Sequence, residues 1–302
     1  MVNGTKRALV QLLAACAVFG CAFGEEDADA ILKSGLQHCT GNGAEADYKA
    51  AVSEFERAAE LGNVEAKALL AECYLLGVGT EPDTAKAVKL LTEAADGDCA
   101  AAQFWLGICH QKGIGMAPDP AKAFQYFEKS AARNNMNANY YLGLCYKNGD
   151  GVKQDSAAAV KALRKAAALG SADAMYQLGI CYDNGIGVES DSNEAFLWFL
   201  QSADAGGSYG EYAMGCAYES GRGVEKDLHR AFDWMLRSAK NNNKYAQYRL
   251  GNFYERGVGV APDLAAAKEW FRRSADAGFF LAKEKLADLE KYETENTDAV
   301  AD

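Results

Sequence analysis

The chain has 302 residues, of which 49% are hydrophobic, so it is long enough and apolar enough to bury a substantial core. Its 31 basic and 42 acidic residues give a formal net charge of −11. We expect no nucleic-acid partner, because contacts with phosphates need a basic surface. Three histidines are present, and none stands in the close cluster of histidine and cysteine that a metal site requires, so no metal ligand and no cofactor are expected.

Residues 1–24 are predicted to form a secretory signal peptide. Lys6 and Arg7 precede an apolar run from Ala8 to Phe23, and acidic residues begin abruptly at Glu25. A short basic region, an apolar core and a small-residue exit are typical of such a leader, and the run is shorter than the roughly twenty residues of a membrane span. We therefore expect a secreted, periplasmic or cell-envelope protein, or a protein of the secretory lumen in a eukaryote.

Two cysteines in this leader leave lipidation open as an alternative. The short segments that end at Cys16 and at Cys21 both resemble the bacterial lipoprotein box, which ends in a lipidated cysteine. An N-terminal lipid anchor through Cys16 or Cys21 would hold the chain at the envelope as a lipoprotein.

Beyond the leader, the sequence repeats itself with a period of 36 residues. The segment Leu178–Asp191, LGICYDNGIGVESD, has close counterparts that begin at Leu106, Leu142 and Leu250. An alanine keeps the same spacing without insertion or deletion, at Ala51, Ala87, Ala123, Ala159, Ala195, Ala231 and Ala267. A fixed period of this length indicates an array of stacked units, none of which can bury its apolar face alone.

The repeats divide the mature chain into an array and a tail. Seven whole units run from about residue 30 to 281, and a polar half unit at about 282–292 is expected to cap the last one. We place the repeat domain at residues 25–292 and predict a flexible acidic tail at residues 293–302, which has little to bury.

Each unit is predicted to contain two helices joined by a glycine turn. In the fifth unit, small and apolar residues recur at helical spacing from Ala174 to Tyr182, and Gly185 is the natural left-handed cap. Asp191 is expected to begin the second helix, because aspartate is a preferred N-cap. Gly179 predicts a close approach of two helices, since glycine inside a helix costs about 1 kcal/mol relative to alanine.

The repeated residues are, in order, alanine, leucine-glycine, tyrosine, G-x-G-V, aspartate, alanine, tryptophan and paired alanines. With these residues at these offsets, residues 30–292 resemble the Sel-1-like repeat family. This family is related to the tetratricopeptide repeats, whose period is about 34 residues. The resemblance implies an all-α, right-handed superhelical solenoid of paired antiparallel helices with a C-terminal capping helix. It also implies a non-enzymatic adaptor that holds a protein or peptide on its concave face, and we expect a monomer.

Two other functions remain open. Some members of a cysteine-rich, secreted branch of the family are linked to β-lactam or cell-wall chemistry, so a cell-wall or β-lactam hydrolysing enzyme is one alternative. That branch ties each repeat with its own disulfide, whereas this chain repeats a single cysteine per unit at Cys73, Cys109, Cys145 and Cys181. We interpret these as buried thiols, with an isolated Cys39–Cys73 bridge left open. The other alternative is a stabilising subunit of a membrane-associated complex.

No catalytic residue is assigned. The repeated glycine pairs do not continue into a phosphate-binding loop and are explained by helix termination. No Ser-His-Asp set or carboxylate pair stands out, because the recurring aspartates are already assigned to helix caps.

Candidate binding residues occupy slots that vary from unit to unit while their neighbours stay fixed. Such slots are not needed by the fold, so we expect them to face solvent on the first helices, which line the inside of the curve if the family resemblance holds. Trp105 and Tyr141 would then form an exposed aromatic pair of the kind that anchors protein partners. The alternative is that both fold back onto the adjacent unit. The predicted partner-binding residues are Trp105, Tyr141, Gln177, Arg249, Lys112, Asn148, Asn184 and Arg256.

A uniform aromatic slot lies beside the variable ones and is interpreted as core. It contains Phe104, Tyr140, Tyr176, Tyr212 and Tyr248.

Overall fold

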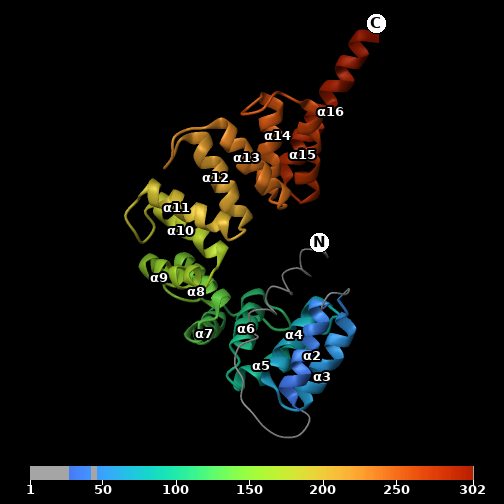
Figure 1. The fold of residues 1–302 in the computed structure, drawn as a ribbon, viewed down its shortest axis with the longest axis vertical. Helices are drawn as coiled ribbons and strands as arrows, with labels where there is room; N and C mark the ends of the chain where they lie inside the picture. The colour runs from blue at the N-terminus through green and yellow to red at the C-terminus, as the bar shows by residue number, and fades with distance from the viewer. Residues whose placement is uncertain (1–26, 42–45, 302) are drawn as a thin grey trace. The chain divides into compact units, whose positions relative to one another are not determined.

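Seven helix pairs follow one another in the computed structural model, which describes residues 27–41 and 46–301 (Figure 1). The first helices of the pairs are α2 (Ala28–Thr40), α4 (Val64–Leu76), α6 (Ala100–Lys112), α8 (Met136–Asn148), α10 (Ala172–Asn184), α12 (Ser208–Ser220) and α14 (Lys244–Arg256). The second helices are α3 (Tyr48–Glu60), α5 (Thr84–Asp96), α7 (Pro120–Ala132), α9 (Ser156–Ala168), α11 (Ser192–Asp204), α13 (Leu228–Lys240) and α15 (Leu264–Asp276). The expected all-α array is confirmed. The predicted leader, with Cys16 and Cys21, lies outside the described residues.

The helix boundaries follow from the residues predicted to cap them. Gly185 ends α10 in the left-handed conformation, with φ of 68°, and its N–H donates to the carbonyl of Cys181. The side chain of Asp191 accepts hydrogen bonds from two backbone N–H groups in the first turn of α11. The same pairing of a glycine cap and an aspartate cap recurs in every unit, so each of the paired helices spans 13 residues.

The glycine inside the first helix makes room for a large side chain from the second. A Cβ at Gly179 would clash with the ring of Phe199, and a Cβ at Gly107 would clash with Phe127. Close helix packing therefore explains the helical glycine, as predicted. Phenylalanine occupies this second-helix position in alternate units and a smaller aliphatic residue occupies it in the others; the series is Phe55, Leu91, Phe127, Leu163, Phe199, Met235 and Phe271.

A last helix, α16 (Phe280–Ala301), follows the seventh pair. The repeat pattern predicts a capping helix that ends near Tyr292, whereas α16 continues to Ala301. Residues 293–301 contain neither glycine nor proline, so nothing in this stretch breaks the helix. The flexibility of the tail stays a prediction.

The chain divides into two compact units that each contain several repeats. The first compact unit extends up to Gln154 and the second begins at Asp155, and each is described by itself. One pair of consecutive first helices is in contact in each compact unit, α4 with α6 in the first and α10 with α12 in the second. Within each compact unit a second helix packs against the first helices on either side of it in the chain, as α3 does against α2 and α4 and as α11 does against α10 and α12. None of the described helices is both long and apolar enough to cross a membrane.

The cysteines of the described residues are free thiols. Six of them are buried, and only Cys216 is half-buried. Cys39 and Cys73, the pair left open for a bridge, are among the buried thiols, and burial raises their pKa values to about 11 and about 12. These side chains therefore act as small apolar core residues.

Candidate partner-binding surface

The first helices carry all of the residues that the sequence predicts to contact a partner. Those near the helix ends are exposed, namely Lys112, Asn148, Asn184 and Arg256. Those in the earlier slot are half-buried, namely Trp105, Tyr141, Gln177 and Arg249. Binding by these residues stays a prediction, because exposure alone does not identify a contact surface.

In the first compact unit, Trp105 and Tyr141 both pack against one buried ring, that of Phe104. Their ring centroids lie 5.7 and 5.6 Å from that of Phe104, which is 6% exposed. Tyr141 also covers Phe127 at 5.3 Å, and Trp105 forms a side-chain hydrogen bond with Glu72. Both rings are half-buried, so each supports the core and also keeps an edge in solvent.

In the second unit, a cavity opens at the equivalent position. Ala213 in α12 takes the place that Tyr141 has two repeats earlier, and Phe199 in α11 takes the place of Phe127. Phe127 is fully buried beneath Tyr141, whereas Phe199 is only half-buried. The cavity beside Phe199 and Ala213 has a volume of about 230 Å³. It exists because the methyl group of Ala213 does not fill the space of a tyrosine ring.

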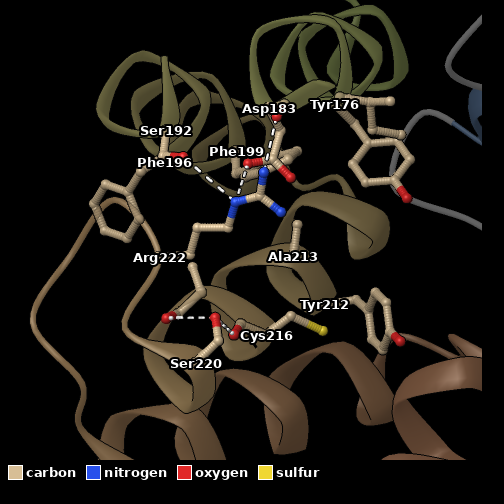
Figure 2. A pocket seen from close by; sticks show the side chains of 12 residues that line it. Tyr176, Asp183, Ser192, Phe196, Phe199, Tyr212, Ala213, Cys216, Ser220 and Arg222 are labelled. Atoms are coloured by element: carbon tan, nitrogen blue, oxygen red, sulfur yellow. Dashed lines mark hydrogen bonds and ion pairs between the residues drawn. The ribbon is translucent and has the colours of Figure 1, made fainter. Parts of the chain in front are cut away.

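Aromatic and aliphatic side chains form the wall of this cavity (Figure 2). They come from three helices: Tyr176 and Ile180 from α10, Phe196 and Phe199 from α11, and Tyr212 from α12. An engineered apolar cavity of about 150 Å³ is large enough to bind benzene. The cavity in this chain therefore has room for one apolar or aromatic side chain of a partner.

Arg222 forms the polar rim. It stands between two glycines after α12, where several other repeats have valine or isoleucine, as at Val78, Ile114 and Ile186. Its guanidinium lies 2.8 Å from the carboxylate of Asp183 and donates to the Asp183 carbonyl at 2.9 Å (Figure 2). Ala213 and Arg222 therefore both depart from the repeat pattern, and both line this cavity.

A continuous row of tyrosines, here called the tyrosine strip, extends from the cavity along α10, α12 and α14. Neighbouring ring centroids lie 5.5 Å apart for Tyr176 and Tyr209, 6.3 Å for Tyr209 and Tyr245, and 6.4 Å for Tyr212 and Tyr245. The row ends where Phe279 lies 5.1 Å from Tyr248 and 5.3 Å from Tyr245. The strip consists of Tyr176, Tyr209, Tyr212, Tyr245 and Tyr248.

The strip corrects the interpretation of the uniform aromatic slot as core. Phe104 is buried as expected, but Tyr140, Tyr176, Tyr212 and Tyr248 are half-buried. Two further tyrosines, Tyr209 at 42% and Tyr245 at 37% exposed, were not predicted as surface residues. The sequence signal for these two residues is a tyrosine that stands three residues before the tyrosine of the uniform aromatic slot. This spacing occurs only in the sixth and seventh repeats.

Ion pairs between consecutive repeats lie along the other end of the same first helices. Near the end of α10, α12 and α14, an acidic residue pairs with a basic residue of the next repeat. The pairs are Asp183–Arg222 at 2.8 Å, Glu219–Arg249 at 2.6 Å and Glu255–Lys285 at 2.8 Å. Arg249, a predicted contact residue, is therefore held by Glu219. This edge of the surface is therefore polar, and in each pair the charge of the acidic side chain is neutralised by its basic partner.

The site offers apolar contact and hydrogen bonding, and no group of metal-ligating residues comes together in the described part of the chain. Repeated helix pairs that expose aromatic rings define a helical-repeat scaffold. The Sel1 repeat model matches residues 28–63, 64–99, 100–135, 137–171, 172–207, 208–243 and 244–279. The chain belongs to the Sel1 repeat family, whose members are generally non-enzymatic scaffolds for protein interactions.

Solved structures agree with this assignment. A protective antigen of uropathogenic Escherichia coli strains with an SLR fold is 31% identical, with a TM-score of 0.68 over 94% of this chain and 59% of its own, so this chain spans less than two thirds of that structure. A Sel1 repeat protein from Oxalobacter formigenes is 32% identical, with a TM-score of 0.70 over 87% of this chain and 77% of its own.

A more distant match shows the fold alone. An immunity protein from Pseudomonas aeruginosa is 21% identical, with a TM-score of 0.50 over 74% of this chain and 88% of its own. Among curated proteins, none matches the sequence significantly.

Proposed function

We propose that this chain is a non-enzymatic scaffold that binds a protein or peptide segment on the face formed by its first helices. The observation that carries the proposal is the cavity at Ala213, which adjoins an exposed aromatic strip. A pocket for one buried side chain beside aromatic surface is the arrangement in which a few anchors supply most of the binding energy. The family resemblance implies that this face lies on the concave side.

Selection from a library of displayed short random peptides tests this function directly. The purified chain should enrich peptides that an Ala213→Tyr variant no longer retains, because the introduced ring fills the cavity as Tyr141 fills the equivalent space in the first unit. Leu197→Ala is the matched control, since Leu197 on α11 is 49% exposed and does not line the cavity. Recovery of the same peptides by the wild type and by Ala213→Tyr would refute the site.

The residues predicted from the sequence extend the proposed contact. Gln177, Asn184, Arg249 and Arg256 belong to the same helices as the strip. Trp105, Tyr141, Lys112 and Asn148 form a separate candidate region within the first compact unit. Loss of a selected partner from a folded Trp105→Ala/Tyr141→Ala variant would support that second region. Undiminished capture of the partner would remove it.

Secretion or an envelope location is part of the proposal and depends on residues 1–24. Intact-mass measurement of the protein from its native source would show a chain that begins at Glu25, or a chain that begins at a lipidated Cys16 or Cys21. A monomer is expected in solution. A hydrolase and a stabilising membrane-complex subunit remain alternative hypotheses, which hydrolysis of a β-lactam reporter and crosslinking in intact cells, respectively, would support.

A further inference from the structure

The tyrosine strip presents two kinds of group to a partner, aromatic ring surface and phenolic hydroxyls. Tyr209 and Tyr245 are the most exposed members. Among the described residues, no protein group forms a hydrogen bond with the hydroxyls of Tyr209, Tyr245 or Tyr248. Tyr212 differs from these three, because its hydroxyl forms a hydrogen bond with the Cys216 thiol. A tyrosine hydroxyl is protonated at neutral pH, and burial raises the pKa of Tyr209 and of Tyr176 further. The strip is therefore a row of apolar faces with free hydrogen-bond donors at Tyr209, Tyr245 and Tyr248.

A segment in the polyproline II conformation has the complementary chemistry. Its backbone carbonyls have no internal hydrogen-bond partners and can accept from phenolic hydroxyls. Its proline rings are apolar and flat enough to lie on aromatic faces, and proline has no N–H that would need an acceptor. A helical segment, by contrast, already satisfies its own carbonyls, so the hydroxyls along the strip would gain nothing from it.

The spacing of the strip also fits this conformation. Packed helices lie about 8–10 Å apart, and α10 packs directly against α12. One polyproline II turn contains three residues and advances about 9 Å. Every third residue of such a segment, lying across α10 and α12, would meet the next equivalent tyrosine, Tyr212 after Tyr176.

The charges near the strip favour an uncharged occupant. Asp183, Glu219 and Glu255 are each paired with a base of the next repeat. Two charges of opposite sign adjoin the strip itself, Asp173 beside Tyr209 and Lys244 at 5.4 Å from the Tyr245 ring centroid, so the strip carries no excess of one sign that would select a strongly charged ligand. An oligosaccharide could also stack on tyrosine rings, so its binding is one outcome of the test below.

We propose that the tyrosine strip binds a proline-rich segment of a partner protein in the polyproline II conformation, with one of its apolar side chains in the cavity at Ala213. This inference rests on the proposed function, because it names the chemistry of the partner at the same surface.

Fluorescence anisotropy with labelled peptides tests the inference. The first peptide repeats the triplet Leu-Pro-Pro, the second repeats Leu-Ala-Ala, and the third has the composition of the first with its prolines moved out of the three-residue period. The wild-type chain should bind the first peptide about tenfold more tightly than either of the others. Tyr209→Ala/Tyr245→Ala should weaken binding of the first peptide by about tenfold or more, and Leu197→Ala should leave it unchanged.

Equal affinity for the proline and alanine peptides would overturn the inference, as would unchanged binding by the double tyrosine variant. Tighter binding of a linear oligosaccharide or of the helix-prone alanine peptide would also overturn it. These results are distinguishable from failure of the proposed function. Selected peptides that need the cavity at Ala213 but contain no proline period would refute only the conformation, whereas a selection that enriches no peptide would refute peptide binding itself.

Discussion

The side chain of Trp105 in α6 forms a hydrogen bond with the carboxylate of Glu72 in α4, across two consecutive first helices. Glu72 is 4% exposed, and its burial raises its pKa from the ordinary 4.5 to about 7, while the hydrogen bond from Trp105 acts in the opposite direction. A contact between repeats in the first unit therefore contains a carboxyl group that titrates near neutral pH.

This titration makes stability depend on pH. The folded state holds the Glu72 proton up to about pH 7, whereas an unfolded carboxyl group releases it near pH 4.5. Because the folded state binds the proton more tightly, the free energy of unfolding should fall as pH rises through that window, by up to ~3 kcal/mol. Urea unfolding at several pH values should show this fall in the wild type and its loss in Glu72→Gln. Parallel curves for the two proteins would contradict the assignment to Glu72.

Reciprocal substitutions at Tyr141 and Ala213 test the origin of the cavity. Tyr141→Ala should open the corresponding space over Phe127 and destabilise the chain by about 2 kcal/mol. Ala213→Tyr should cover Phe199 and raise stability by about 1 kcal/mol. Melting temperatures and urea midpoints of both variants give the measurement. A destabilised Ala213→Tyr would mean that the cavity cannot accept a ring in the tyrosine rotamer.

Gly185 should matter for stability before it matters for binding. Its φ of 68° is left-handed, and a β-branched residue there is strained, so Gly185→Val should cost roughly 2 kcal/mol of unfolding free energy. Gly185→Asn is the matched control and should cost clearly less, because asparagine adopts this conformation more readily. An unchanged melting curve for Gly185→Val together with lost peptide binding would reverse this interpretation.

Glu211 in α12 is fully buried and depends on two residues of the following helix and its cap. Arg237 Nε lies 2.6 Å from its carboxylate, and the Asn241 side-chain amide donates to both carboxylate oxygens at 3.0 and 2.8 Å. Arg237→Met should cost about 2 kcal/mol, because the carboxylate loses its charged partner. Adding Glu211→Leu should recover much of that loss, since an apolar pair replaces a stranded charge. No recovery in urea unfolding would show that Arg237 acts through packing alone.

The array could be predicted from the sequence because its determinants are local and repeated. Gly185 and Asp191 cap their helices through contacts within a few residues, and their counterparts do the same in each unit. Gly179 predicts a close approach of two helices, although the sequence does not identify the side chain of the next helix that fills the space.

The candidate site was harder to predict because it arises where the pattern is interrupted. The cavity at Ala213 is the absence of a ring, and a small residue in a variable slot has no periodic signal. Tyr209 and Tyr245 lie in a slot where other units have unrelated residues, so nothing in the repeat marked them. The pairing of Arg249 with Glu219 depends on the geometry between neighbouring repeats, which a one-dimensional spacing does not contain.

The alternation of phenylalanine with a smaller aliphatic residue along the second helices has a consequence for how such a chain can change length. Its chemical period is two repeats, or 2 × 36 = 72 residues, although its backbone period is 36. Excision of one repeat would bring two like neighbours together, either two phenylalanines or two aliphatic residues, and would leave a volume mismatch at the new junction. Excision of two consecutive repeats would preserve the order of large and small layers. Such a chain is better suited to shorten or lengthen in steps of two repeats than in single ones.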